Sequence, residues 1–174
     1  MRLLLDRLES PVGTLLLVSD GRSLRSLDFI DYEERALKLI RRRFGESELV
    51  EADDPQGFSA VFRAYFAGDL RAPESLPVAT GGTTFQERVW AELRRIPVGR
   101  TVTYGHLASV LGQPTASRAV GLANGLNPIA IAVPCHRVIG GNGKLTGYAG
   151  GLHRKEWLLR HEGALRPTQP GLFG

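Results

Sequence analysis

The segment TVTYGHLASVLGQPTASRAVGLANG, residues 101–125, has the pattern of two short helices around a turn. Apolar residues follow Tyr104 at helical spacing, the sequence GQP interrupts them, and Thr115 can cap a second helix that ends near Gly125. Two helices joined in this way form a helix-turn-helix, but any pair of packed helices shares the pattern. The segment therefore predicts a helical C-terminal domain and leaves DNA binding as one alternative.

The second of these helices is thin on one side. Glycine and serine weaken a helix, so their presence indicates that a large group approaches this side closely. Close packing against another helix and close approach of a ligand both satisfy the pattern. The small residues are Ala116, Ser117, Ala119, Gly121, Ala123 and Gly125.

A linker is expected upstream of the two helices. Residues 68–82, GDLRAPESLPVATGG, contain two prolines and no apolar periodicity. We therefore expect an N-terminal domain over residues 1–80, a C-terminal domain over residues 81–166 and a flexible tail over residues 167–174.

The N-terminal region combines strands with helices. The apolar runs LLLDRLES, GTLLLVSD and SLRSLDFID are divided by the turn signals SPVG and DG, which predicts an antiparallel meander. Helical spacing then predicts helices over residues 32–44 and 58–66. Since the C-terminal region is mostly helical, the chain is expected to have an α+β fold.

Three further patterns organise the C-terminal region. Thr83 or Thr84 can cap a helix in a capping box with the Gln or Glu three residues on, and a last helix ends at Gly163. In residues 140–151, GGNGKLTGYAGG, Leu145 follows Gly143-Lys144 where a phosphate-binding loop needs Ser or Thr, and Thr146 stands where a dinucleotide site needs its third glycine. Residues 140–151 predict a tight hairpin turn followed by a loop.

Charge is unevenly distributed along the 174 residues, whose net charge is +4. Residues 1–85 hold 11 Lys and Arg against 14 Asp and Glu, whereas residues 86–165 hold 10 against 4. The basic second half suits a polyanion partner without requiring one. No apolar run is long enough for a membrane span, and Asp6 and Glu9 break the one at the start, so we expect a cytoplasmic protein without a signal peptide.

The chain contains a single cysteine, Cys135, within IAVPCHRVIG, residues 131–140. A lone cysteine is most often a small buried apolar residue. Here Pro134 ends an apolar run and two basic residues follow the thiol, a setting that lowers a thiol pKa and favours a nucleophile. His136 could act as its base, oriented by a carboxylate such as Glu162.

The segment around Cys135 and three other segments resemble those of a known family. VPCHRVIG, TVTYGHLA, SRAVGLANGLNPIAIA and GYAGGLHRKEWLLRHEG are similar to segments of the O6-alkylguanine-DNA alkyltransferases, the methylated-DNA–protein-cysteine methyltransferases, in their bacterial constitutive type. The resemblance is dense over residues 84–164 and loose before residue 80. It implies a ribonuclease-H-like N-terminal domain and a winged helix-turn-helix-like C-terminal domain.

The resemblance implies roles for five residues around the thiol. Cys135 matches the alkyl acceptor, His136 the histidine that takes its proton through a water, and Glu162 the carboxylate that orients this histidine. Asn127 matches the asparagine that orders the loop behind the site, and Tyr104 matches the tyrosine that donates a hydrogen bond to the leaving guanine.

The family also contributes residues that hold DNA and the flipped base. A stacked base cannot present its alkyl carbon in line to a protein nucleophile, so it must rotate out into a pocket. The resemblance implies that an arginine, the finger, enters the base stack in place of the flipped base and that a thin helix lies in the minor groove. It also implies that further residues line the pocket around the base. These residues are Arg118, Ala119 and Gly121 on the helix, and Val138, Tyr148 and Ala149 in the pocket, where Ala149 replaces a serine of the human form.

The implied reaction is irreversible transfer of the alkyl group from O6-alkylguanine, and from O4-alkylthymine, to Cys135. No second cysteine can accept the alkyl group, so one turnover per molecule is expected. The resemblance implies a monomer without a cofactor, and we expect no zinc, because the N-terminal region lacks cysteines and histidines. The tail resembles a sliding-clamp-binding peptide through Gln169, Leu172 and Phe173, although a disordered tail has the same appearance.

Three alternatives remain open at this stage. A family-like protein that binds alkylated DNA without repairing it would replace Cys135. A helix-turn-helix regulator in the major groove would carry polar base-reading side chains in place of Ala119 and Gly121. A Cys-His hydrolase would turn over repeatedly and would need an oxyanion hole.

Overall fold

The computed structural model describes residues 1–165, which form two compact units. The first unit comprises Met1–Gly82 together with Pro128–Ala132, and the second comprises Thr83–Asn127 and the described residues from Val133 onward. The tail, with the clamp-binding residues suggested for it, lies outside the described residues. Among residues 1–165, no helix is long and apolar enough to cross a membrane.

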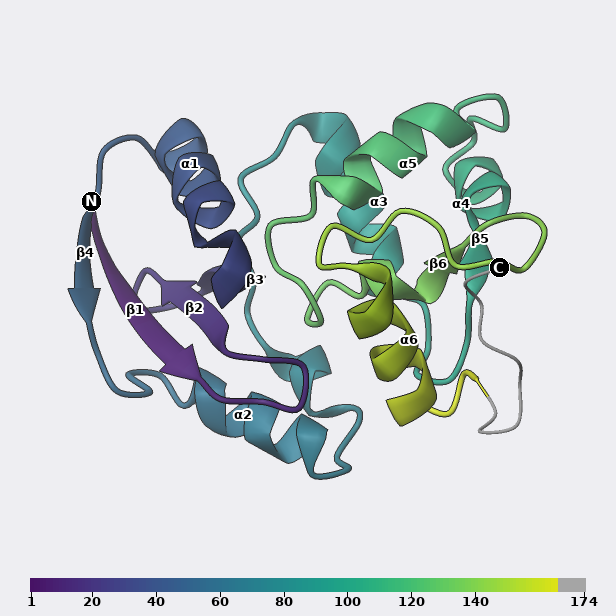
Figure 1. Cartoon of the computed structure of the whole chain (residues 1–174). Coiled ribbons are helices and arrows are strands. Elements are labelled where there is room, and N and C mark those ends of the chain that lie inside the picture. Colours follow the sequence, from purple (N-terminus) through teal and green to yellow (C-terminus); the bar gives the residue numbers. More distant parts are fainter. Residues whose placement is uncertain (166–174) are drawn as a thin grey trace. The chain divides into compact units, whose positions relative to one another are not determined.

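The first unit is built on a four-stranded mixed sheet of order β3-β2-β1-β4 (Figure 1). The predicted meander is confirmed, since β2 pairs antiparallel with both β1 and β3. β4, a short strand with glutamates at both ends, was not predicted from the sequence and pairs parallel to β1. The strands are β1 (Arg2–Leu8), β2 (Leu15–Ser19), β3 (Leu24–Phe29) and β4 (Glu48–Glu51).

Both faces of this sheet are covered. Every residue of β2 is buried, which is typical of a strand with packing on each side. Alternate side chains of β1 and β2 form one apolar cluster with Ile40 of α1 (Glu33–Phe44), next to a one-turn 3-10 helix, η1 (Ile30–Tyr32). The intervening residues of the same strands lie on the opposite face and line a pocket with Phe58, the first residue of α2 (Phe58–Phe66). The two helices predicted from the spacing are therefore present.

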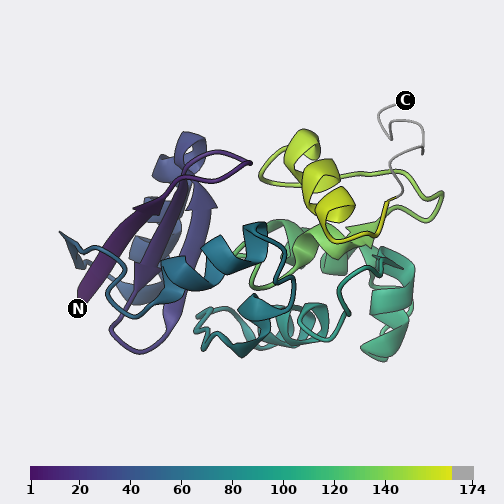
Figure 2. The ribbon, with the colours of Figure 1, turned by 90° about the horizontal axis from the view of Figure 1, so that it is seen from below.

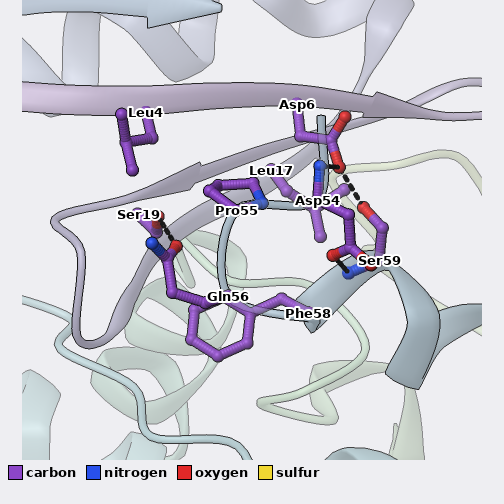
Figure 3. Close-up of a pocket in the computed structure, with 9 residues that line it drawn as sticks. All are labelled: Leu4, Asp6, Leu17, Ser19, Asp54, Pro55, Gln56, Phe58 and Ser59. Atoms are coloured by element: carbon purple, nitrogen blue, oxygen red, sulfur yellow. Dashed lines mark hydrogen bonds between the residues drawn. The ribbon is translucent and has the colours of Figure 1, made fainter. Parts of the chain in front are cut away.

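Figure 3 shows the polar groups that line this pocket of the first unit. Asp6 of β1 accepts hydrogen bonds from the backbone N–H of Asp54 (3.1 Å) and from the hydroxyl of Ser59. Asp54 accepts in turn from the backbone N–H groups of Ser59 (2.8 Å) and Ala60 (3.3 Å), which are free donors in the first turn of α2. This network fastens the start of α2 to the sheet.

The segment predicted as a linker is partly structured. It contains the 3-10 helix η2 (Ala72–Ser75), and the backbone of Leu24 in β3 exchanges hydrogen bonds with Pro77 and Ala79. The later segment Pro128–Ala132 also pairs with β3, through a bridge between Leu27 and Ile129. The linker lacks periodicity because its order comes from pairing with a distant strand and not from a local repeat.

The second unit begins with α3 (Thr84–Leu93). The predicted capping box is confirmed at Thr83: its hydroxyl accepts from the N–H of Gln86 (3.2 Å), and the Gln86 side chain accepts from the N–H of Thr83 (3.0 Å). Val89 and Leu93 are fully buried as the spacing predicts, and so is Trp90, whose indole N–H donates to the carbonyl of Ala123 (2.9 Å). The helix is thereby joined to the next pair of helices.

The two helices of the opening segment are α4 (Tyr104–Val110) and α5 (Ser117–Gly125), and they pack against each other. Thr103 caps α4 by accepting from the N–H of His106 (3.1 Å). The prediction that Thr115 caps α5 is wrong, because Ala116 occupies the cap position and no side chain accepts a hydrogen bond there. The chain enters α5 through a turn closed by backbone groups of Ala116 and Gln113 instead.

The remaining elements surround the segment that contains the cysteine. A 3-10 turn, η3 (Cys135–Arg137), leads into β6 (Val138–Ile139), which pairs parallel with β5 (Val102–Thr103). The predicted tight turn lies between Gly140 and Lys144, whose backbones are hydrogen-bonded. After the glycine-rich loop comes α6 (Leu152–His161), whose C-cap residue is Glu162, and the predicted stop at Gly163 follows with a positive φ of 75°. The α+β fold class is confirmed.

Candidate active site

Cys135 lies at the start of η3, where the apolar segment that precedes it ends. Its side chain is buried, its N–H donates to the carbonyl of Val133 (2.8 Å), and its own carbonyl accepts from the Asn124 side chain (3.4 Å). Asn127 donates to the carbonyl of Val133 as well (2.7 Å). Asn124 in the last turn of α5 and Asn127 just after that helix therefore hold the backbone on both sides of the thiol.

The residue after the cysteine, His136, forms a buried pair with Glu162. His136 Nε2 lies 2.9 Å from Glu162 Oε2, and neither side chain has any solvent exposure. Arg137 donates to the same carboxylate from Nε to Oε1 (2.8 Å) and from Nη2 to Oε2 (3.1 Å). Its Nη1 donates to the carbonyl of Ile96 after α3 (2.7 Å). The carboxylate is thus held by a guanidinium fork and an imidazole.

The protonation of this cluster follows from burial and charge. Burial raises the pKa of Glu162, but His136 and Arg137 outweigh it and hold that pKa well below its usual range. We attribute this mainly to Arg137, because a guanidinium is always charged. Burial lowers the pKa of His136 against the opposing pull of Glu162, so the imidazole is neutral near pH 7.

The neutral histidine has one defined tautomer. An ionised carboxylate only accepts hydrogen bonds, so His136 Nε2 carries the hydrogen that is donated to Glu162. The Nδ1 atom then has a free lone pair, and it is buried without a hydrogen-bond partner among the described residues. A buried acceptor without a partner is costly. The arrangement therefore holds a base ready next to the cysteine in the chain.

Tyr104 and the glycine-rich loop form a second group of contacts. The Tyr104 hydroxyl donates to the carbonyl of Thr146 (3.2 Å), and desolvation by burial raises the pKa of this phenol. The loop is close to the ring, because a Cβ added at Gly147 would lie 3.7 Å from the hydroxyl oxygen. Within this part of the unit, Val138 and Tyr148 are buried and Ala149 is exposed.

The thin helix α5 has two different surfaces. Arg118 and Ala119 are exposed, and Leu122, one turn further on, is 68% exposed. Gly121 instead contacts a side chain of α4: a Cβ there would lie 3.7 Å from Cδ1 of Tyr104. The small residue at Gly121 therefore makes room for a neighbouring ring, whereas the surface around Arg118 and Ala119 is open.

Lys155 of α6, whose side chain has no solvent exposure, was not predicted as a site residue. Its ammonium donates to the carbonyls of Val138 (2.5 Å) and Thr146 (2.9 Å). The signal was present, because Lys155 shares helical spacing with Leu158, Leu159 and Glu162, which are all buried. Asn124, which is 2% exposed and bonded to the cysteine carbonyl, was also missed.

The fold and the site together define a class of protein. A thiol with a neutral, carboxylate-bound histidine beside it lies in the same unit as a helix-turn-helix. Among residues 1–165, no group of three or more His, Cys, Asp or Glu side chains could hold a metal ion. The class is a protein with a buried cysteine as candidate nucleophile in a domain that contains a helix-turn-helix.

Comparison with known proteins identifies the family. The model for the DNA binding domain of 6-O-methylguanine DNA methyltransferase matches residues 84–164, and the model for its ribonuclease-like domain matches residues 4–80. The chain belongs to this family, in agreement with the resemblance.

Relatives and solved structures match over nearly the whole chain. The methylated-DNA–protein-cysteine methyltransferase of Shigella flexneri is 51% identical over 95% of this chain and 98% of its own length. The O6-methylguanine methyltransferase of Mycobacterium tuberculosis has a TM-score of 0.79 at 40% identity, covering 96% of each chain. A structure of Mycobacterium tuberculosis OGT in complex with DNA matches at 42% identity and a TM-score of 0.79, over 92% of this chain and 93% of its own.

Proposed function

We propose that this protein repairs alkylated DNA by transferring the alkyl group of O6-alkylguanine, and of O4-alkylthymine, to the sulfur of its own Cys135. One observation carries the proposal: the buried Nδ1 of a neutral His136 is free to accept a proton, while Nε2 is fixed on Glu162. The names of the relatives, which describe methylated DNA and a protein cysteine, support the same substrate and acceptor.

The transfer is a substitution at the alkyl carbon. The thiol proton passes through one water to His136 Nδ1, and the thiolate attacks the carbon bonded to O6. The S–C bond forms as the C–O6 bond breaks, and the electron pair of that bond goes to the guanine. Glu162 stabilises the imidazolium that forms. Tyr104 donates a hydrogen bond to the leaving guanine, which takes up a proton from water and is restored, and the imidazolium of His136 returns the thiol proton to water.

Each molecule reacts once. The product is an S-alkylcysteine, a thioether without an easy leaving group, and the sequence has no second cysteine to receive the alkyl group. The protein is therefore a stoichiometric reagent that is consumed as it repairs. It needs no cofactor for this chemistry, because the nucleophile, the base and the orienting carboxylate are all side chains.

Access to the base requires DNA binding and base flipping. The open surface of α5 fits the minor groove, since Ala119 adds little width and Arg118 is exposed beside it. We infer that Arg118 enters the stack in place of the flipped base and that the base lies among Val138, Tyr148 and Ala149. The DNA complex of a relative supports the binding of DNA by this domain type.

The remaining proposals concern organisation. We infer that residues 1–80 support the C-terminal domain, residues 81–166, which carries the reaction. We further propose that the protein acts as a monomer in the cytoplasm. A sliding clamp is proposed as a partner of the tail, and deletion of residues 167–174 should then abolish retention by an immobilised clamp; unchanged retention would contradict this.

The central test uses duplex DNA with a radiolabelled O6-methyl group on one guanine. We expect one label per protein molecule, located by peptide mapping on Cys135. Cys135→Ser should capture none. Repair of many lesions by one molecule, or label on another residue, would overturn the proposal in favour of a hydrolase or another acceptor.

The finger role of Arg118 has its own test. Arg118→Ala should slow transfer from duplex DNA about tenfold or more, because the flipped base is no longer replaced in the stack, but should leave transfer from free O6-methylguanine unchanged. Equal losses on both substrates would remove the role. Arg100→Ala, at an exposed arginine before α4, serves as the matched loss of one positive charge.

A further inference from the structure

Lys155 is a buried charge that the proposed reaction does not use. Among the described residues it has no carboxylate partner, and its hydrogen bonds go to two backbone carbonyls, those of Val138 and Thr146. Burial lowers the pKa of Lys155 to about 8, and the nearby Cys135 acts in the opposite direction. Burying an ammonium group in this way is costly, and an apolar side chain would fill the space without that cost. A specific role is therefore expected.

The two acceptors connect separate parts of the site. Val138 begins β6, directly after the turn that carries the cysteine, while Thr146 lies in the glycine-rich loop. Lys155, on α6, thus links the loop to the strand through these two hydrogen bonds. Nearby, Gly147 has a positive φ of 56°, a conformation that most residues avoid, so the backbone there departs from regular structure.

The carbonyl of Thr146 has two donors, the ammonium of Lys155 and the hydroxyl of Tyr104. A carbonyl oxygen has two lone pairs and can accept both. Tyr104, however, has one O–H hydrogen, which cannot be donated to Thr146 and to a guanine at the same time. If Tyr104 donates to the leaving guanine, it must first release Thr146.

We propose that Lys155 is a positioning residue that holds the glycine-rich loop by the Thr146 carbonyl while the Tyr104 hydroxyl exchanges its hydrogen bond from that carbonyl to the flipped guanine. This inference rests on the proposed function. The exchange costs little because Thr146 keeps one donor throughout. Without Lys155, the loop would lose its link to Val138 and would depend on the single hydrogen bond from Tyr104, so it would already be less stable without DNA. Release of Tyr104 to the guanine would then free the loop that forms the pocket wall.

The first experiment measures loop stability without DNA, by hydrogen exchange of the backbone N–H groups in residues 140–151. Lys155→Met should accelerate exchange in this segment about tenfold or more, whereas Tyr104→Phe should leave it unchanged, because Lys155 still holds Thr146. Lys144→Met, at an exposed lysine of the same loop, is the matched control. Equal acceleration in Lys155→Met and Tyr104→Phe would overturn the inference.

The second experiment is a double-mutant cycle on the single-turnover rate of transfer from duplex DNA. Tyr104→Phe alone should slow transfer roughly tenfold to a hundredfold, as expected for a hydrogen bond to developing charge. In the Lys155→Met background the same change should cost about threefold or less, because the loop is already misplaced. Multiplicative losses would show that the two residues act independently and would overturn the inference.

Two controls keep these outcomes interpretable. Unfolding by urea separates a local change in the loop from a loss of overall stability. If Lys155→Met does not fold, Lys155→Arg retains the charge and donors, and its loop exchange should stay near the wild-type rate; tenfold acceleration would contradict the role. If wild-type protein transfers no label to Cys135, the proposed function fails, whereas the loop measurement remains a separate result.

Discussion

Two clusters of polar side chains, one half-buried and one fully buried, also differ in how completely their atoms are paired. In the first unit, Asp6 and Asp54 accept hydrogen bonds from Ser59 and from backbone groups at the start of α2 (Figures 1 and 3). In the second unit, Glu162 is held just as fully, but its partner His136 retains an unpaired buried nitrogen. Both clusters fasten elements together, and only the second is left with chemistry to perform. The difference teaches that a fully buried pair with one polar atom left without a partner distinguishes the cluster to which we assign the reaction.

Breaking the second cluster should have the largest effect. Glu162→Gln removes the anion that compensates Arg137, so the free energy of unfolding should fall by about 3–5 kcal/mol. The tautomer of His136 is no longer fixed, and transfer from duplex DNA should slow by about a hundredfold or more. Urea unfolding and single-turnover transfer measure the two effects.

A matched control lies on the same helix. Glu156 pairs with Arg160 near the surface (2.9 Å), so Glu156→Gln should change stability by no more than about 1 kcal/mol and leave transfer unaffected. If Glu162→Gln behaved like this control, the carboxylate would not have the role assigned to it.

Breaking the first cluster should affect stability alone. Ser59→Ala removes one donor to Asp6 and should lower the free energy of unfolding by about 1–3 kcal/mol. The rate of transfer to Cys135 by the folded protein should be unchanged, because all the atoms of the first cluster already have partners within their own unit. Ser47→Ala, in an exposed loop, should stay within about 0.5 kcal/mol. A reduced transfer rate in folded Ser59→Ala would contradict the conclusion that the first cluster affects stability alone.

Lowering the pH should reduce the free energy of unfolding, by less than the substitutions above. Because burial lowers the pKa of His136 below its ordinary 6.5, the unfolded chain binds more protons as pH falls below 6.5, and stability should decrease there. The depressed pKa of Glu162 acts in the same direction, with its contribution complete above the ordinary 4.5 and lost as pH falls below it.

Urea unfolding between pH 4 and pH 8 measures this dependence. His136→Gln should remove the part of the decline that begins near the ordinary histidine pKa and keep the part due to the carboxylate. A wild-type stability that rises on acidification over this range would contradict the neutral, buried state of His136.

Local patterns in the sequence predicted much of the fold. The meander, the two helices that cover it and the capping box at Thr83 all follow from signals within a few residues of each other. The strand Glu48–Glu51 was missed because its apolar and polar residues do not alternate strongly. It also pairs with β1, from which it is separated in the chain by two strands and a helix. The cap assigned to Thr115 was wrong, since backbone groups of the turn closed the start of α5 instead.

The site was predicted unevenly for the same reason. Cys135, His136 and Glu162 came from a motif and a resemblance, while Asn124 and Lys155 were overlooked. Asn124 donates to a backbone carbonyl eleven residues away, and Lys155 donates to backbone carbonyls nine and seventeen residues away. A carbonyl has no signature in the sequence, so its partners cannot be recognised by residue type.

By itself, the sequence determined the α+β class and the family and predicted the nucleophile in its basic setting, because these depend on local periodicity and on a distinctive run of residues. Only the tertiary structure decided which nitrogen of His136 is free, that Arg137 shares Glu162, and that Lys155 and Tyr104 meet at one carbonyl. These features depend on atoms that are brought together by folding, and burial sets their charge states once they meet.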